Sequence, residues 1–269
     1  SASWQYVGGL LLAGARYERG VTVRHVGKPL PSEPHVQMTV AMLRLAGVGV
    51  DEKPDTWRVE PGPIGPLDID IEPDLSSAAP FLAAALVTNG RVVVPSWPEL
   101  TTQAGAALPE LLTLLGGICR LDATGLSVQG TGGIRGIDVD LHEVGELTPV
   151  LAAVAALADS PSVLRGVAHL RGHETDRLAA LAAELTALGG DVNETVDGLT
   201  IRPRPLKGGT FRTYADHRMA QAGAVLGLAV DGIDVEDVAT TAKTLPDFVR
   251  IWSRLVETAE VGRAGVDGL

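Results

Sequence analysis

Residues 162–203 read SVLRGVAHLRGHETDRLAALAAELTALGGDVNETVDGLTIRP, and this stretch contains the pattern on which the whole chain is built. It begins with a short apolar run, Ser162 to Val167, which favours a strand. The Ala/Leu-rich segment from Leu178 to Leu188 predicts a helix that ends at a Gly-Gly pair. The Asp-Gly step at 197–198 then predicts the turn of a β-hairpin. Between strand and helix lies HLRGHETDR, which has more ionisable side chains than the start of a helix requires.

The same order of elements recurs along the chain. Four copies open with a polar cluster followed by small apolar residues, and equivalent positions in them are Ser3, Ser76, Glu146 and Asp216. These positions are about 70 residues apart, as in a structural repeat. In each copy a β-branched strand and a second helix follow, and the first three copies close with a hairpin. We therefore expect an α/β fold of repeated units whose polar helix starts face one site, because helix N-termini attract anions.

The composition narrows the class of protein. The chain has 269 residues, of which 45% are hydrophobic, and a formal net charge of −11, which disfavours non-specific binding to nucleic acid. No apolar run reaches the ~18 residues that a membrane span needs, and the first residues lack the basic segment of a signal peptide. Cys119 is the only cysteine, which excludes an internal disulfide and a thiolate metal cage. We expect a cytoplasmic protein without metal.

Both ends of the chain look cut relative to the repeat. No strand precedes the first helix of the first copy, and no hairpin follows the last copy, so we expect the 269 residues to belong to a longer architecture. The segment IGPLDIDIEP from Ile64 to Pro73 has prolines and no helical period, which is typical of a linker. This predicts one domain over residues 1–67 and a second over residues 68–269, with units at roughly 68–137, 138–206 and 207–269.

Several motifs resemble those of a known family. HETDRLAAL at 173–181, YADHRMAQAGA at 214–224 and AKTLPDF at 242–248 are similar to the C-terminal signatures of the EPSP synthase (3-phosphoshikimate 1-carboxyvinyltransferase) family, and the HETDR form resembles actinobacterial members. Four more motifs lie where the family has its own, namely SASWQY at 1–6, SEPH at 32–35, PDLSSAAPFLAAA at 73–85 and VGELTP at 144–149. The resemblance covers nearly the whole chain in the same order.

The resemblance implies the enolpyruvyl transferase fold, an inside-out α/β barrel of two lobes with the active site between them. Each lobe has three βαβαββ units. On this scheme residues 1–67 are the last unit of the first lobe, and residues 68–269 are most of the second lobe. The Lys motif and the Gly-rich loop of the family's N-terminal lobe are not in this sequence. We therefore expect the missing N-terminal lobe to be a partner of this chain, and the chain alone to be inactive.

The resemblance also implies an enzyme of the shikimate pathway of aromatic amino acid biosynthesis. The family transfers the enolpyruvyl group of phosphoenolpyruvate to the 5-hydroxyl of shikimate 3-phosphate, through a tetrahedral intermediate that loses phosphate, without a cofactor. Such chemistry needs cations for two anionic substrates and an acid–base pair. The family's motifs place the catalytic carboxylates at Glu146 and Glu174, the phosphoenolpyruvate-binding cations at Arg177, Arg218 and Lys243, and the shikimate 3-phosphate contacts at Ser3, Gln5, Ser32, Glu146, His169 and His173.

These residues also have purely structural interpretations. Arg177 and Arg218 are spaced to pair with Asp176 and Asp216 on the surface. Glu146 can serve as a helix cap, because acids favour the first turn. His173 stands where many family members have Lys, and a His contact with substrate predicts that acceptor binding weakens as pH rises through the His range.

Trp4 departs from the family pattern, which usually has a second Ser at this position. An indole removes a hydroxyl donor and crowds the expected phosphate site. Two alternatives therefore stay open. One is a paralogous enolpyruvyl transferase that acts on another phosphorylated alcohol, and the other is a non-catalytic anion-binding module.

Overall fold

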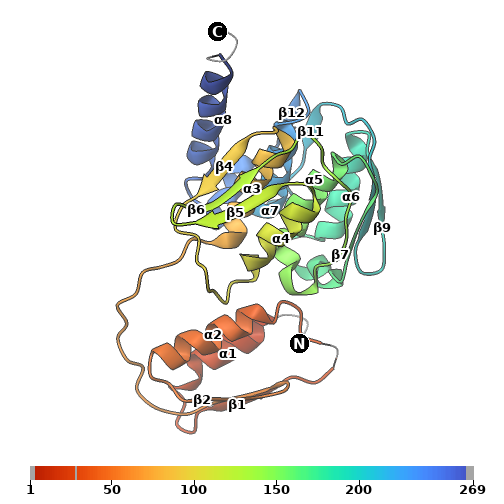
Figure 1. The fold of residues 1–269 in the computed structure, drawn as a ribbon. Coiled ribbons are helices and arrows are strands. Elements are labelled where there is room, and N and C mark those ends of the chain that lie inside the picture. The colour runs from red at the N-terminus through yellow and green to blue at the C-terminus, as the bar shows by residue number, and fades with distance from the viewer. Residues whose placement is uncertain (1–3, 28, 265–269) are drawn as a thin grey trace.

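Two hydrophobic cores divide the chain in the computed structural model, which describes residues 4–27 and 29–264, with side chains as far as residue 257. One core joins side chains between Val7 and Val59, and the other joins side chains between Leu75 and Leu226. Figure 1 shows them as a red and orange N-terminal body, residues 4–59, and a larger yellow-to-blue C-terminal body, residues 75–264. Residues 60–74 contain neither helix nor strand, as expected of a linker. The domain boundary after residue 67 stays a prediction.

The N-terminal body consists of two helices on one antiparallel sheet. Its elements are α1 (Trp4–Gly14), β1 (Val21–Arg24), α2 (Pro34–Leu45), β2 (Val50–Lys53) and β3 (Thr56–Val59), with the strands in the order β1-β3-β2. Val7 and Leu11, four residues apart on α1, are buried in its core. A Cβ on Gly14 would lie 2.6 Å from Cγ1 of Val21. Glycine at this position therefore lets the end of α1 lie directly against the sheet.

The first unit of the C-terminal body repeats this plan. Its elements are α3 (Leu75–Val87), β4 (Arg91–Val94), the 3-10 helix η1 (Ala104–Ala107), α4 (Leu108–Leu114), β5 (Ile118–Asp122) and β6 (Gly125–Gln129), with antiparallel strands in the order β4-β6-β5. The carboxylate of Asp74 accepts a hydrogen bond from the N–H of Ser77 at 2.9 Å and so caps the start of α3.

The second unit of this body has the complete βαβαββ order. Its elements are β7 (Asp138–Asp140), the 3-10 helix η2 (His142–Leu147), α5 (Thr148–Ala156), β8 (Ser162–Arg165), the 3-10 helix η3 (Ala168–Gly172), α6 (Arg177–Ala187), β9 (Asp191–Glu194) and β10 (Leu199–Arg202). Strand β7 runs parallel to β8, while β10 pairs antiparallel with both β8 and β9. The hairpin turn predicted at 197–198 lies between β9 and β10 and is confirmed.

The third unit of this body ends in a long helix. Its elements are β11 (Gly209–Phe211), α7 (His217–Gly227), β12 (Ile233–Val235), the 3-10 helix η4 (Val238–Lys243) and α8 (Phe248–Ala264), and its two strands are parallel. Even α8, with 17 residues, is too polar to cross a membrane, and no other helix within residues 4–27 and 29–264 has the necessary length and apolarity.

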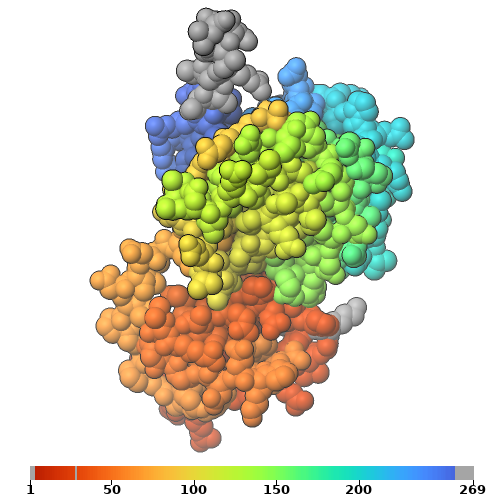
Figure 2. Space-filling model, in the orientation of Figure 1, coloured from red at the N-terminus to blue at the C-terminus, as the bar shows by residue number. Residues whose placement is uncertain are grey.

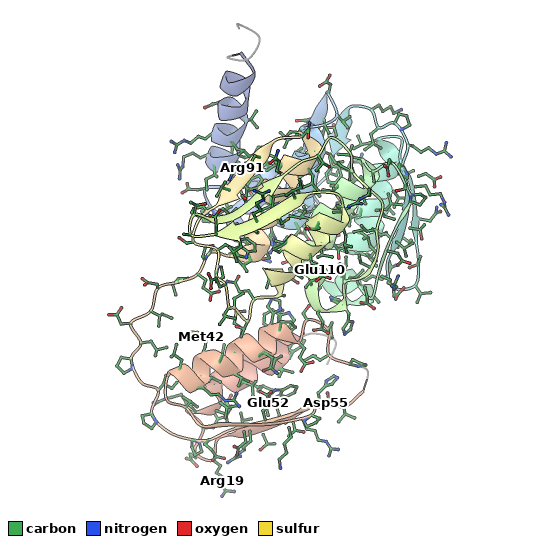
Figure 3. The ribbon with its side chains drawn as sticks, viewed as in Figure 1. Arg19, Met42, Glu52, Asp55, Arg91 and Glu110 are labelled. Carbon is green, nitrogen blue, oxygen red and sulfur yellow. The ribbon has the colours of Figure 1, made fainter. Side chains whose placement is uncertain are left out.

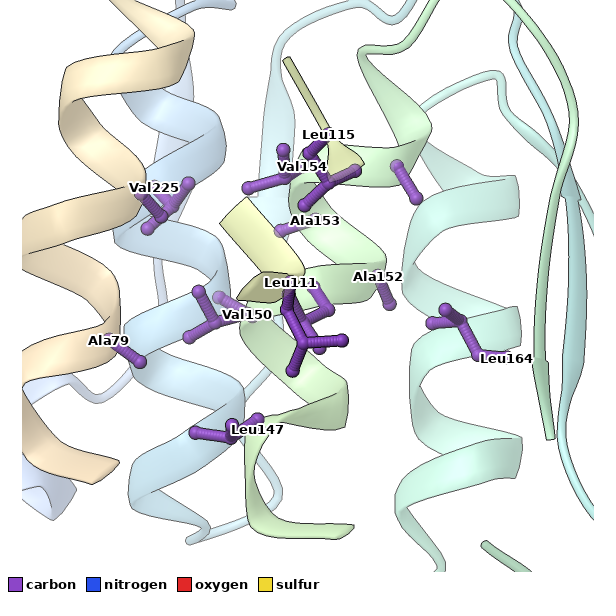
Figure 4. Close-up of a cluster of buried hydrophobic side chains, with 14 of the residues drawn as sticks. Ala79, Leu111, Leu115, Leu147, Val150, Ala152, Ala153, Val154, Leu164 and Val225 are labelled. Atoms are coloured by element: carbon purple, nitrogen blue, oxygen red, sulfur yellow. The ribbon is translucent and has the colours of Figure 1, made fainter. Parts of the chain in front are cut away.

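Three helices, one from each unit, form the centre of the C-terminal body. Helices α3, α5 and α7 contact one another, and every residue of α5 is buried. Figure 4 shows Val150 of α5, Ala79 of α3 and Val225 of α7 in one cluster of buried side chains. The many alanines of these helices explain this packing, because short side chains let helix axes approach closely. The repeat inferred from the sequence is therefore confirmed as a three-dimensional arrangement.

Candidate active site

A cleft of about 1290 Å³ lies between the two bodies. In the space-filling view the red and orange body meets the yellow and green part of the larger one (Figure 2). Nine of the residues proposed from the sequence line this cleft, namely Gln5, Ser32, Glu146, His169, His173, Glu174, Arg177, Arg218 and Lys243. Ser3 lies outside the described residues. The structure thus brings together every described residue of the predicted site, although it does not test their individual roles.

The starts of the three central helices all reach the cleft. Ser76 is the second residue of α3, Glu146 lies two residues before α5, and Arg218 is the second residue of α7. These positions are equivalent, or nearly so, in the repeat. The expectation that the repeat directs polar helix starts at one place is therefore confirmed.

Arg177, the first residue of α6, lies in a buried ion pair. Its Nε and Nη2 donate to the two carboxylate oxygens of Asp216 at 2.8 and 3.2 Å, and only 3% of its side chain is exposed. Nη2 also donates to Glu174 at 2.9 Å. The surface pair of Arg177 with Asp176, considered as a structural alternative, is not formed, because Asp176 pairs with Arg171 instead.

Asp216 is placed by an unusual segment of backbone. Tyr214 and Ala215 both have positive φ angles, 54° and 56°, which non-glycine residues rarely adopt. The Tyr214 hydroxyl donates to Glu184 at 2.6 Å and holds this turn in place. The chain then enters α7 with the Asp216 carboxylate buried, where it also accepts from the N–H of Arg218 at 2.8 Å.

Aspartates cap the helices that begin at the cleft. Asp176 accepts from the N–H of Ala179 at the start of α6, and Asp216 accepts from the N–H of Arg218 at the start of α7. Each aspartate thus takes up one of the unpaired N–H groups at the start of its helix. The arginine side chains at the starts of α6 and α7 add positive charge to the cleft.

Arg218 is held by the start of α3. Its Nη1 donates to the carbonyl oxygen of Ser76 at 2.8 Å, and its Nη2 donates to the Ser76 hydroxyl at 2.6 Å. Only 6% of the residue is exposed. Burial lowers the pKa of Arg218, and the negative charges of Asp74 and Glu146 partly offset this effect. A guanidinium remains protonated under such conditions, so the cleft keeps a permanent positive charge here.

Lys243 and Glu174 form an ion pair at the edge of the cleft. Lys243 is the last residue of η4, and α8 begins only at Phe248. Desolvation raises the pKa of Glu174, but the hydrogen bond from Lys243 and the charges of Arg177 and Lys243 outweigh it and bring the pKa to about 2. Glu174 is therefore a carboxylate at neutral pH.

All six histidines of the chain line the cleft. The rings of His142, His169 and His173 follow one another at centroid distances of 5.9 and 5.8 Å. Burial and the neighbouring positive charges lower the pKa of His169 to about 4. Burial and the charge of Arg177 also lower the pKa of His173, so the window in which His173 gains a proton lies below its ordinary range. At neutral pH the rings of His169 and His173 are therefore neutral hydrogen-bonding groups.

The Trp4 ring lines the cleft and is held there by another ring. It stacks on the imidazole of His35, with ring centroids 4.3 Å apart and an angle of 20° between the planes. Nε2 of His35 lies 3.7 Å from a carboxylate oxygen of Glu146, which belongs to the other body. Trp4 thus supports a residue that faces one of the two proposed catalytic carboxylates.

Sequence reasoning missed some residues that the cleft contains. Ser76 and His142 line it and were not proposed. A signal for Ser76 was present, because it is the repeat equivalent of Glu146. Nothing comparable marked His142. Within the described ranges, no group of three or more His, Cys, Asp or Glu side chains is arranged to hold a metal ion.

Comparison with known proteins points to the same family as the sequence motifs. The family model of EPSP synthase (3-phosphoshikimate 1-carboxyvinyltransferase) matches residues 1–252. Two structures of EPSP synthase from Acinetobacter baumannii resemble this chain, with TM-scores of 0.74 and 0.73, sequence identities of 26% and 25%, and coverage of 92% and 94% of this chain.

The enolpyruvyl transferase NikO from Streptomyces tendae shares the fold, with a TM-score of 0.69 and 22% identity over 94% of this chain. The chain spans only 59% to 60% of the length of these three proteins. Because the family model covers nearly all of the sequence, the chain belongs to the EPSP synthase (3-phosphoshikimate 1-carboxyvinyltransferase) family.

Proposed function

We propose that this chain supplies one wall of an active site that transfers the enolpyruvyl group of phosphoenolpyruvate to the 5-hydroxyl of shikimate 3-phosphate. The observation that carries the proposal is the gathering of Arg177, Arg218 and Lys243 with Glu146 and Glu174 in one cleft. Phosphoenolpyruvate carries a phosphate and a carboxylate, and clustered cations of this kind bind such groups through charge-assisted hydrogen bonds. Membership of the family supports the choice of donor and acceptor.

For the donor to bind, Arg177 and Lys243 have to exchange a carboxylate partner within the protein for the anionic groups of the ligand. Glu174 occupies both Arg177 and Lys243. Asp216 stays buried beside Arg177 and keeps this guanidinium in place. A more highly charged ligand anion competes best for the two cations that Glu174 holds, so Glu174 is the carboxylate that is displaced.

This displacement gives Glu174 a role in proton transfer. While the two cations hold it, its pKa is about 2 and it cannot carry a proton at neutral pH. Release from them raises its pKa toward the ordinary range, because the opposite charges that lowered it are then neutralised by the ligand. We assign to Glu174 the proton that joins the methylene carbon of the donor as the acceptor oxygen bonds to the neighbouring carbon. The C–O bond to phosphate then breaks, the new methyl group returns a proton to Glu174, and the proton taken from the acceptor hydroxyl by Glu146 leaves with the phosphate.

The acceptor side of the cleft is built mainly of neutral polar groups. Glu146 lines it from just before α5, and we propose that it accepts the proton of the acceptor hydroxyl. Gln5 and Ser32 line the same space from the N-terminal body, and His169 and His173 line it from the C-terminal body. We propose these residues as the contacts of shikimate 3-phosphate.

The N-terminal body has an apolar face that suits further repeat units. Helix α1 is the repeat equivalent of α3, α5 and α7, yet Leu10 is 46% exposed and Leu12 is 55% exposed on it. On α2, Met42, which Figure 3 labels, and Leu45 are also exposed. We propose that two more units of the same kind, forming the rest of an N-terminal lobe, cover this face and supply the opposite cations. The cytoplasmic location stays a prediction.

Direct binding of phosphoenolpyruvate tests the proposal. Calorimetric titration of the 269-residue chain is expected to show binding that weakens about tenfold or more in Lys243→Ala, because a charge-assisted contact is lost. Lys207→Ala is the matched control, since Lys207 is an exposed lysine outside the cleft. Equal affinities of the two variants would contradict the proposal. We expect no release of phosphate from the two substrates with this chain alone.

A second candidate is transfer to another phosphorylated alcohol, and the Trp4–His35 stack favours it because it places an indole where a hydroxyl donor is usual in the family. Titration with shikimate 3-phosphate distinguishes the candidates, since only the first requires that it binds. A non-catalytic anion-binding module would bind phosphate, sulfate and phosphoenolpyruvate with similar affinity.

A further inference from the structure

Ser76 of α3 binds the guanidinium of Arg218, a residue that lies 142 positions later in the sequence. Ser76 accepts from Nη1 through its carbonyl oxygen at 2.8 Å and from Nη2 through its hydroxyl at 2.6 Å. Gln221, one turn further along α7, accepts from Nη1 at 3.3 Å. In the part of the chain that the structure describes, these bonds use three of the five N–H donors of the guanidinium, which leaves donors for an anion in the cleft.

The carbonyl of Ser76 can accept this bond because of a proline inside the helix. In an α-helix the carbonyl of a residue accepts from the N–H four residues later. Four residues after Ser76 stands Pro80, which lies within α3 and has no N–H. The carbonyl of Ser76 is therefore not needed by the helix, and it receives Arg218 instead.

The hydroxyl of Ser76 is oriented by its own neighbour. It donates to a carboxylate oxygen of Asp74 at 2.7 Å, so its lone pairs are directed toward the Arg218 guanidinium. The segment before α3 is itself tied down, because the Gln103 side chain accepts from the N–H of Leu75 at 3.0 Å and donates to the carbonyl of Pro73 at 2.9 Å. The acceptor for Arg218 thus stands on a fixed piece of backbone.

We propose that Ser76, helped by Pro80 and Asp74, is a positioning residue that holds the Arg218 guanidinium in the orientation required by the donor anion. The inference rests on the proposed function, in which Arg218 binds phosphoenolpyruvate. A buried guanidinium that is already oriented loses little conformational freedom on binding, so its contact with the ligand is stronger than that of a mobile side chain.

The test compares two neighbouring serines. Ser76→Ala is expected to weaken phosphoenolpyruvate binding by about tenfold, because a hydrogen bond to a charged group is lost and the guanidinium is freed. Ser77→Ala is the matched control, since Ser77 also donates to Asp74, at 2.9 Å, but does not contact Arg218. Its affinity is expected to stay close to that of the wild type. Ser76→Thr keeps the hydroxyl and is expected to restore binding.

Pro80→Ala tests the second contact. The N–H that it introduces competes for the carbonyl of Ser76, so phosphoenolpyruvate binding is expected to weaken, but less than in Ser76→Ala. Equal affinities of Ser76→Ala and Ser77→Ala overturn the inference while leaving the proposed function intact.

If the wild-type chain does not bind phosphoenolpyruvate, the proposed function fails, and the inference is then decided by crystal structures of the two serine variants. A guanidinium of Arg218 that moves in Ser76→Ala and not in Ser77→Ala supports it. A guanidinium that stays in place in both variants refutes it.

Discussion

The carboxylate of Asp216 accepts from Nε and Nη2 of Arg177 in a two-pronged pair, and neither side chain is more than 3% exposed. The same carboxylate caps α7 through the N–H of Arg218. Asp216 therefore links α6 to α7 and sets the position of two arginines at once. Because both members of the pair are buried, each depends on the other for compensation of its charge.

Removal of the charge at Asp216 is expected to destabilise the protein. Asp216→Asn keeps the shape and the capping oxygen but leaves the buried Arg177 with only the partly exposed Glu174, at a cost of about 3 kcal/mol in the free energy of unfolding. Urea unfolding at neutral pH measures this loss. Asp247→Asn is the control, because Asp247 pairs with Arg250 on the surface and little change is expected there. A similar loss of unfolding free energy in both variants would show that burial of the Arg177–Asp216 pair does not determine the cost of removing the charge.

The two histidines with a pKa of about 4, His169 and His217, are expected to make stability depend on pH. Burial is the largest cause in both, and positive neighbours add to it. In the unfolded chain their pKa is near 6.5, so between pH 6.5 and pH 4 the unfolded state binds more protons than the folded state. The free energy of unfolding therefore falls as pH falls through this window and levels off below it.

A double variant, His169→Asn with His217→Asn, measures this effect. Urea unfolding between pH 7 and pH 4 is expected to give a flatter dependence on pH for the variant than for the wild type. Parallel curves for the two proteins would mean that the histidines do not resist protonation in the folded state.

Gly145 is expected to control the position of the His169 ring. A Cβ at Gly145 would lie 2.5 Å from Nε2 of His169, which is closer than any normal contact, so the ring has to move. Gly145→Ala is expected to cost about 1–3 kcal/mol of stability, as overpacking does, and to shift the ring resonances of His169. Gly133→Ala is the control, because a Cβ there has no neighbour within 4 Å. Unchanged His169 resonances in Gly145→Ala would contradict the expectation.

The helices and strands could be predicted from the sequence because their signals are local. The Ala/Leu run of α6 and the Asp-Gly turn after β9 each lie within a few residues of the structure that they specify. The start of the last helix is harder to predict, because Pro246 is compatible with the first turn of a helix but does not fix where the helix begins. The chain forms a short 3-10 helix that ends at Lys243, and α8 begins only after the proline.

The site was predicted as a set of residues, but its pairings were not. Arg177 binds a carboxylate 39 residues away, and Arg218 binds a serine 142 residues away. Such partners depend on how the units pack and on the left-handed turn at Tyr214 and Ala215, and no sequence spacing reports either. The charge state of Glu174 has the same origin, since its pKa depends on two cations that the fold brings to it.

Glu143 is expected to hold the two bodies together. Helix α2 has no side-chain cap of its own, and the Glu143 carboxylate of the other body accepts from the N–H of Glu33 at 3.0 Å. Next to it, the N–H of Ser32 donates to the carbonyl oxygen of His142 at 3.1 Å. A carboxylate at a helix start stabilises the first turn through both the hydrogen bond and the helix dipole.

Glu143→Ala is therefore expected to speed amide hydrogen exchange in the first turn of α2 and to leave the interior of α5 unchanged. Glu110→Ala is the control, because Glu110 is an acid in the first turn of α4, a helix of the larger body. Small-angle scattering provides a second measurement, since loss of the contact allows the bodies to separate around residues 60–74 and enlarges the molecule. The same exchange rates in both variants would mean that the bond between the backbone of Ser32 and His142 is enough to hold α2 against the larger body.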